Sequence, residues 1–245
     1  MARFFIEKED IRGDVLFVRE DAHHILHVLR LGAGDPVTLC DGEGKDYLCR
    51  IEAAAEDGVR CRLQSIQTAC GEPRVQITLF QGLTKGDKME WIIEKGVEAG
   101  ICSFVPLELS RCVSRPDDKK ITGKLARWNK ISRAAAKQCQ RGRIPQVEKP
   151  LRLEEAIRRF ASFDLVLVCY EEQRDNSLRN ILQTLPAPPE KVAVLIGPEG
   201  GLEGTEVEKC IEAGARIVGL GPRILRTETA GMITAALVLY EFGQM

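Results

Sequence analysis

The sequence predicts an α/β protein in which a small antiparallel β-barrel precedes an α/β domain with a parallel sheet. Three observations support this fold class. The first 70 residues contain short strand-like segments separated by turn signals. From residue 74 onward, strand and helix patterns alternate, which is typical of a parallel sheet with helices on both faces. Glycine and proline interrupt the pattern at 69–73, so we expect domains at 1–72 and 73–245.

In the first domain we expect four strands and one helix. The segments 32–35 and 41–44 are rich in glycine and aspartate, the composition of turns between strands. A short helix is expected at 22–30. The strands are expected at 14–19, 36–40, 46–53 and 58–67.

In the second domain, continuously apolar strands indicate a sheet that is buried on both faces. The helix expected at 87–99 carries Met89, Ile92 and Val97 on one face. The strands are expected at 75–81, 102–107, 164–170, 191–196 and 216–220. Further helices are expected at 121–139, 153–160, 176–183, 203–213 and 228–242.

The composition excludes several classes of protein. Of 245 residues, 44% are hydrophobic and 29% are charged, which is typical of a folded globular protein and not of a disordered one. The apolar runs are far shorter than the roughly 20 residues of a membrane helix. The N-terminus lacks the apolar segment of a signal peptide. We therefore expect neither a membrane span nor a leader.

Nine cysteines are scattered along the chain, an odd number without a C-x-x-C motif. This pattern indicates neither a disulfide framework nor a zinc site. We expect reduced thiols, most of them packed as small hydrophobic groups, and a cytoplasmic protein.

The net charge of −1 conceals a strong segregation of charge. The stretch 111–143 contains eleven lysines and arginines and two acids, a local charge of +9. Two explanations are open for this stretch: a solvated helix face, or a surface that binds an anionic partner.

The first segment with a chemical signature is I-G-P-E-G-G-L at 196–202, between an expected strand and an expected helix. An ordinary turn needs one glycine, whereas three in five residues favour a loop whose backbone approaches a ligand closely. The segment matches neither the dinucleotide pattern G-x-G-x-x-G nor the triphosphate-binding pattern that ends in Gly-Lys-Ser/Thr.

The second segment is L-G-P-R-I-L-R-T-E-T-A at 220–230, between the last strand and the last helix. Helix capping accounts for part of it, with Thr227 as the N-cap and Glu228 near the helix dipole. It leaves Arg223 and Arg226 unexplained. Because ligands bind at the carboxyl ends of parallel strands, we expect both segments to line one pocket.

The two segments together resemble the signature of the RsmE-like family of SPOUT ribosomal RNA methyltransferases. The resemblance extends to H-H-x-x-x-V-L-R-L at 23–31, the Asp41-Gly42 turn, the segment 81–100, Leu109-Ser110-Arg111 and the segment 134–145. Lys137 and Cys139 depart from the family pattern, which has an acid and a serine there. No acidic role is therefore expected at position 137.

The resemblance implies a PUA-like barrel at 1–72 and a SPOUT domain at 73–245 that contains a trefoil knot. It implies S-adenosylmethionine as the cofactor and a homodimer with the pocket near the subunit interface. The implied reaction is methylation of N3 of a uridine in 16S ribosomal RNA, so the implied partner is this RNA or the small ribosomal subunit. No metal is implied.

Carried over residue by residue, the resemblance assigns the cofactor to the two segments and to the strand end at 169–171. The expected cofactor-binding residues are Tyr170, Gly197, Pro198, Gly200, Gly201, Leu220, Gly221, Ile224, Leu225, Arg226, Thr229 and Ala230. The expected RNA contacts are His24, Arg30, Lys85, Arg111, Lys124, Arg127, Lys130 and Arg141.

The expected catalytic residues follow from the acceptor atom. Uracil N3 is a poor nucleophile until its imide proton leaves. Arg226 is our first candidate to stabilise the resulting anion. Glu199 or Glu228 is expected to take the proton, and the alternative is that these carboxylates anchor Arg226 or cap a helix.

Three histidines cluster in the first domain. His23 and His27 lie four residues apart on one helical face, a spacing that suits a metal pair, but no third ligand is evident. The resemblance instead implies that this helix, with Arg30, presents the barrel to RNA.

Two other functions compete with methyl transfer. One is a non-catalytic RNA-binding protein whose late loops are vestigial, and the intact pair of loops counts against it. The other is a nucleotide-dependent enzyme of the doubly wound type, and the absence of a phosphate-binding pattern at 80–85 counts against that.

Overall fold

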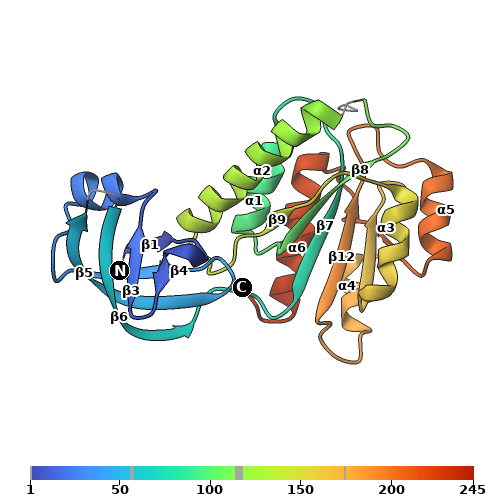
Figure 1. Cartoon of the computed structure of the whole chain (residues 1–245). Helices are drawn as coiled ribbons and strands as arrows, with labels where there is room; N and C mark the ends of the chain where they lie inside the picture. Colours follow the sequence, from blue (N-terminus) through green and yellow to red (C-terminus); the bar gives the residue numbers. More distant parts are fainter. Residues whose placement is uncertain (1, 56–57, 114–117, 174) are drawn as a thin grey trace. The chain divides into compact units, whose positions relative to one another are not determined.

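The structure is a computed structural model that describes residues 2–55, 58–113, 118–173 and 175–245. The chain divides into two compact units (Figure 1). Unit 1 comprises Met1–Glu72 and Ala136–Ile144, and unit 2 comprises Pro73–Ala135 and Pro145–Met245. The return of the later segment to unit 1 is not apparent from the sequence. Residues 114–117 of the basic stretch lie outside the described residues.

Unit 1 is built on one six-stranded sheet with the order β1-β4-β5-β6-β3-β2. The four strands expected from the sequence correspond to β3, β4, β5 and β6, and the sequence does not predict β1 or β2. Neighbouring strands are antiparallel except β1 and β4, whose parallel pairing departs from the expected barrel. The strands are β1 (Ala2–Phe5), β2 (Ile11–Arg12), β3 (Val15–Val18), β4 (Pro36–Cys40), β5 (Lys45–Ala55) and β6 (Gly58–Thr68).

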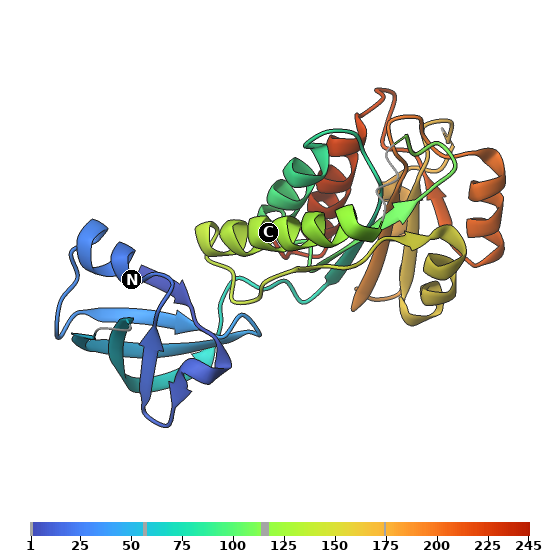
Figure 2. The ribbon, with the colours of Figure 1, turned by 45° about the horizontal axis from the view of Figure 1, so that its top comes forward.

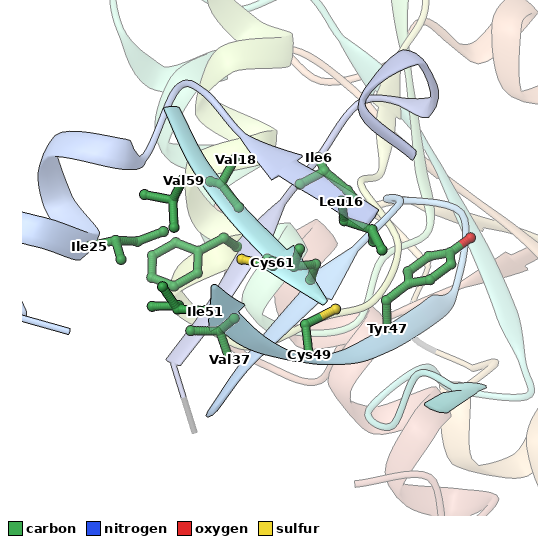
Figure 3. Packing of buried hydrophobic residues seen from close by; sticks show 12 residues of the cluster. Ile6, Leu16, Val18, Ile25, Val37, Tyr47, Cys49, Ile51, Val59 and Cys61 are labelled. Atoms are coloured by element: carbon green, nitrogen blue, oxygen red, sulfur yellow. The ribbon is translucent and has the colours of Figure 1, made fainter. Parts of the chain in front are cut away.

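Aliphatic side chains from these strands form the core of unit 1. Figure 3 shows Val18, Val37, Ile51 and Val59 gathered between the strands, and each is at most 2% exposed. Burial of one such side chain contributes about 1.5–3 kcal/mol. Cys61 belongs to the same cluster, and burial raises the pKa of its thiol to about 12. None of the nine cysteines, all of which lie in the described ranges, forms a disulfide.

The helix expected at 22–30 is a distorted one. Its central part is a π-helix, η2 (His24–Val28), in which the Leu29 amide donates to the His24 carbonyl. The wide turn buries Ile25 completely and leaves His24 and His27 exposed. Arg30 follows with a φ of 55°, which is uncommon for a residue other than glycine. Elsewhere in the described residues, short 3-10 helices are found at η1 (Lys8–Asp10) in unit 1 and η3 (Phe160–Ser162) in unit 2.

Glu72 attaches the segment Ala136–Ile144 to the rest of unit 1. Its carboxylate lies 2.8 Å from Nη2 of Arg141, whose side chain is 4% exposed. The same carboxylate accepts the backbone N–H of Gly142 at 2.9 Å and that of Arg143 at 3.0 Å. One acid thus satisfies a buried guanidinium and two backbone donors.

Unit 2 contains a seven-stranded sheet in which every pairing is parallel (Figure 2). Its order is β10-β8-β7-β12-β11-β13, and β9 pairs with β8. The parallel sheet predicted from the alternating pattern is therefore confirmed. The strands are β7 (Gln76–Gly82), β8 (Ser103–Glu108), β9 (Gln146–Val147), β10 (Leu151–Arg152), β11 (Leu165–Cys169), β12 (Lys191–Ile196) and β13 (Arg216–Val218).

Helices cover both faces of this sheet. In Figure 1, α1 and α6 pack together on one face, with α6 against β7 and β12, while α3 and α5 lie on the other. No helix in the described ranges is both long and apolar enough to cross a membrane. The helices are α1 (Lys88–Glu98), α2 (Asp118–Gln138), α3 (Leu153–Arg159), α4 (Leu178–Gln183), α5 (Gly204–Glu212) and α6 (Thr227–Glu241).

The Glu72 interaction leads to a stability prediction. Glu72→Ala leaves the buried Arg141 guanidinium without its carboxylate, and loss of one partner of a buried ion pair costs about 3–5 kcal/mol. We expect faster amide hydrogen exchange at 136–144 in this variant. As a control, Glu154→Ala breaks an exposed pair with Lys209 on unit 2 and should leave the exchange at 136–144 unchanged. Equal exchange in the two variants would contradict the role of Glu72.

Candidate functional site

A cavity of about 730 Å³ lies at the carboxyl ends of β11, β12 and β13. Parallel strands all present their carboxyl ends at one edge of the sheet, which is where α/β proteins bind ligands. Both glycine-containing segments contribute to its wall. Its lining consists of Lys88, Cys169, Tyr170, Glu171, Gln173, Ser177, Ile196, Gly197, Pro198, Glu199, Gly201, Gly219, Leu220, Gly221, Pro222, Arg223, Ile224, Leu225, Arg226, Thr227, Glu228 and Ala230.

The structure brings most of the expected site residues together at this cavity. All three candidate catalytic residues are in the lining, as are the expected cofactor-binding residues with two exceptions, Gly200 and Thr229. The Gly200 carbonyl accepts a hydrogen bond of 2.9 Å from Nη1 of Arg111. Gly200 therefore faces Arg111, and a Cβ placed on it would lie 3.1 Å from the Arg111 Cβ.

A buried hydrogen-bond chain joins the two segments. The Thr227 hydroxyl donates to the Gly197 carbonyl at 2.6 Å, and Nε2 of Gln81 donates to the same hydroxyl oxygen at 2.9 Å. Gln81, near the end of β7, is fully buried, and Thr227 is 9% exposed. The expectation that Thr227 is the N-cap of α6 is wrong, because Arg226 occupies that position and the Thr227 side chain is engaged elsewhere.

The loop after β12 has a conformation that requires glycine at position 201. Gly201 has a φ of +70°, and a Cβ at this position would lie 2.2 Å from Oε1 of Glu171. The absence of a side chain thus lets the Glu171 carboxylate approach the loop backbone. The sequence identifies this loop by its glycines but not this neighbour.

The loop after β13 presents unpaired backbone to the cavity. In the described part of the chain, Leu220, Gly221, Ile224 and Leu225 make no hydrogen bonds with their backbone groups. Backbone N–H and C=O groups that lack partners within the chain are available to water or a ligand. Apolar side chains accompany them, so this loop suits a flat ligand with both polar edges and apolar faces.

Charged side chains alternate at one side of the cavity. Nζ of Lys88 lies 3.2 Å from Oε1 of Glu199 and 3.4 Å from Oε2 of Glu228. The other Glu228 oxygen is 4.0 Å from Nη1 of Arg226, whose side chain is 82% exposed. The sequence does not single out Lys88, since its place in the chain looks like that of an ordinary residue at the start of a helix.

The surroundings of Glu199 keep it ionised. Partial burial acts to raise its pKa, but backbone N–H groups of Glu199 and Lys85 and the ammonium group of Lys88 outweigh burial and hold the pKa below its usual value. Burial acts to lower the pKa of Lys88, yet the carboxylates of Glu199 and Glu228 raise it on balance. Both members of the Glu199–Lys88 pair therefore carry charge at neutral pH.

Tyr170 and Cys169, at the end of β11, form another part of the wall. A hydrogen bond to Glu172 and burial raise the pKa of Tyr170, so its phenol stays protonated. Burial raises the pKa of the Cys169 thiol to about 12, against a smaller opposite effect of Thr234. Neither group is a nucleophile at neutral pH.

Comparisons with known proteins agree with this site. A family model described as an RNA methyltransferase domain matches residues 71–239, and one described as an RNA methyltransferase PUA domain matches 19–64. Ribosomal RNA small subunit methyltransferase E of Bacillus subtilis is 36% identical over 98% of this chain and 97% of its own. Its counterpart in Mycobacterium bovis is 31% identical over 96% and 90%. The chain belongs to this RNA methyltransferase family.

Solved structures extend the similarity to three dimensions. A putative methyltransferase from Legionella pneumophila, in complex with the cofactor SAM, has a TM-score of 0.83 and 31% identity. Ribosomal RNA small subunit methyltransferase E from Neisseria gonorrhoeae, bound to S-adenosyl methionine, has a TM-score of 0.83 and 28% identity. Each comparison covers 98% of this chain and 97% of the other. The RsmE-like resemblance and the PUA-like domain predicted from the sequence are thus confirmed.

The residues expected to contact RNA are distributed over both units. His24 and Arg30 are exposed on unit 1, whereas Lys85, Arg111, Arg127 and Lys130 are exposed on unit 2, where Lys124 is half-buried.

Several of these cations already have partners within the chain. Arg127 pairs with Glu90 at 2.7 Å and Arg111 holds the Gly200 carbonyl, whereas Lys124 and Lys130 have no ion pair among the described residues. Arg141, another expected RNA contact, is 4% exposed, and its guanidinium lies 2.8 Å from the Glu72 carboxylate.

The histidine cluster and the unusual Lys137 both lie in unit 1. The rings of His23 and His27 lie 4.8 Å apart, and no group of three metal-ligating side chains occurs among the described residues. Lys137 pairs with Asp21 at 2.5 Å and lies 5.3 Å from the centre of the Phe4 ring. A lysine at this position therefore links the end of α2 to the rest of unit 1.

The buried Thr227 hydroxyl leads to a prediction. Thr227→Val keeps the shape of the side chain but leaves Nε2 of Gln81 and the Gly197 carbonyl without this partner, at a cost of about 1–3 kcal/mol. We expect a lower urea midpoint in equilibrium unfolding. Thr229→Val, one half-turn along α6, removes a hydroxyl with no hydrogen-bond partner in the described chain and serves as the control. If both variants unfold at the wild-type midpoint, the hydrogen-bond chain does not hold the two segments together.

Proposed function

We propose that this protein transfers a methyl group from S-adenosylmethionine to N3 of a uridine in 16S ribosomal RNA of the small subunit. The observation that carries this proposal is the cavity where both signature segments meet around Lys88, Glu199, Arg226 and Glu228. Membership of the RNA methyltransferase family supports the reaction class, and relatives bound to the cofactor support its identity.

The residues of the cavity fit S-adenosylmethionine. Unpaired backbone groups at 220–225 can hold the polar edge of the adenine, while Leu220, Leu225 and Ala230 offer apolar contacts to its faces. The cofactor carries no phosphate, which agrees with the absence of a phosphate-binding pattern. When bound, it supplies an electrophilic methyl group on a sulfonium sulfur and leaves as S-adenosylhomocysteine.

The charged residues can activate the uracil. Glu228 accepts the imide proton from N3, and the N3 lone pair then forms the bond to the methyl group. Three donors hold Glu199 ionised with a lowered pKa, which makes it a weak base, and we assign proton acceptance to Glu228. Arg226 is exposed, and its Nη1 atom lies 4.0 Å from Oε1 of Glu228. Its guanidinium stabilises the negative charge that develops on the uracil carbonyl oxygens.

The RNA is bound by basic residues outside the cavity. Lys124 and Lys130 on α2, whose ammonium groups have no acidic partner in the described ranges, are the first candidates for phosphate contacts. His24 and Arg30 on unit 1 are candidates for a second contact. The proposal also includes the homodimer, the trefoil knot of unit 2 and a cytoplasmic location, which agree with the family and with a ribosomal substrate.

A non-catalytic RNA-binding protein is the alternative from a different class. It has no use for the alternating charges of Glu199, Lys88, Glu228 and Arg226 beside unpaired loop backbone. Deletion of the gene followed by mass spectrometry of nucleosides from 16S ribosomal RNA decides between the two. We expect loss of a 3-methyluridine at one position and its return with the wild-type chain. A methylation pattern unchanged by the deletion would refute the proposal.

Gly201→Ala tests the proposed cofactor site. A methyl group at this position conflicts with the positive φ and with the Glu171 carboxylate, so the loop must move. We expect the affinity for S-adenosylmethionine, measured by calorimetry, to fall by about tenfold or more, equivalent to about 1.4 kcal/mol. The control is Gly204→Ala, because Gly204 has open space around its Cβ position. If folded Gly201→Ala binds S-adenosylmethionine with wild-type affinity, this loop is not part of the cofactor site.

The basic face of α2 gives a prediction about salt. Lys124→Ala with Lys130→Ala should weaken binding of 16S RNA and reduce the slope of log affinity against log salt by nearly one for each phosphate that the variant no longer neutralises. Affinity for S-adenosylmethionine should not change. The control is Lys209→Ala, since Lys209 pairs with Glu154 on the surface of unit 2. If the slope of log affinity against log salt does not change, these lysines of α2 form a solvated helix face and do not contact RNA.

A further inference from the structure

Lys88 connects the two acidic residues of the cavity. Glu199 belongs to the segment between β12 and α5, and Glu228 to the first turn of α6, yet both carboxylates lie within 3.4 Å of the same ammonium group. Lys88 itself opens α1. One side chain therefore links three parts of the chain that are distant in sequence.

The stability of α1 does not account for a lysine here. Lys88 is the first residue of the helix, where the helix dipole disfavours a positive charge. Lys95, later in the same helix, pairs with Glu94 and Glu98 of its own helix and needs no other segment. The position of Lys88 is therefore explained by the carboxylates of the cavity.

Glu228 depends on this lysine for its orientation. Its side chain is 17% exposed, and its Oε2 atom is buried without a hydrogen-bond partner among the described residues. The ammonium group of Lys88 is 3.4 Å from that oxygen, and Arg226 is 4.0 Å from the other. Charges thus alternate from Glu199 through Lys88 and Glu228 to Arg226. Without Lys88, the carboxylate of Glu228 loses its interaction on the buried side.

We propose that Lys88 is a positioning residue for methyl transfer, which holds the Glu228 carboxylate in the orientation that proton acceptance and the placement of Arg226 require. This inference rests on the proposed function, in which Glu228 takes the proton from the acceptor. Lys88 acts through Glu228 and need not touch the RNA. Its raised pKa agrees with this role, because the ammonium group stays charged.

Single-turnover methyl transfer to 16S RNA, with enzyme and labelled S-adenosylmethionine at saturation, tests the proposal. Lys88→Met keeps the aliphatic stem and should slow the step about a hundredfold, the scale expected when a catalytic group is misplaced by about 1 Å. The dissociation constants for S-adenosylmethionine and RNA should change little. Lys88→Arg should restore most of the rate, and Lys95→Met, the control on the same helix, should match the wild type. Equal rates for Lys88→Met and Lys95→Met would overturn the proposal.

A double variant distinguishes positioning from an independent effect. If Lys88 acts through Glu228, Lys88→Met combined with Glu228→Gln should be no slower than Glu228→Gln alone, since residues that act as a unit are not additive. If the two substitutions slow methyl transfer by factors that multiply in the double variant, the proposal is overturned. The assay counts methyl groups at any position of the RNA. A wild-type chain that methylates another atom would therefore refute the uridine-N3 assignment, while the variants still test Lys88.

Discussion

The candidate active site depends on one buried hydroxyl group. Thr227 joins the end of β7, through Gln81, to the loop after β12, through the Gly197 carbonyl. Because Thr227 is also the first residue of α6, this contact fixes where the helix begins. The residues on either side of it, Arg226 and Glu228, are thereby held at the cavity. A cap on the helix alone would leave the direction of these two side chains undetermined.

A buried carboxylate holds a second pair of segments together. Glu206 in α5 accepts the backbone N–H of Ser110 at 2.8 Å and that of Glu203 at 2.9 Å. It thereby connects the loop after β8 to the start of α5. Gly201 lines the cavity and Glu203 follows in the same loop, so Glu206 anchors the loop after β12 where it meets α5. Anchors of this kind let loops present backbone groups and charges to a ligand with little reorganisation.

The sequence predicts the six α-helices and the strands other than β1, β2, β9 and β10, because these elements depend on local patterns. It predicts that its two signature segments meet because parallel strands end at one edge of the sheet. β4 and β12 begin and end at the expected residues. What it does not reveal depends on contacts between distant residues. The sequence does not show that Lys88 contacts two carboxylates or that the Thr227 hydroxyl accepts a hydrogen bond from Gln81. Nor does it show that Arg141 is buried against Glu72.

We propose that this cavity holds the methyl donor and that its charged residues face the acceptor. A crystal structure of the chain with S-adenosylhomocysteine tests it most directly. We expect the adenine to lie against the backbone of 220–225, with hydrogen bonds to groups that are unpaired without the ligand. We expect the thioether sulfur on the side of Glu228 and Arg226. A ligand bound outside this cavity, or one whose sulfur faces away from these residues, would contradict it.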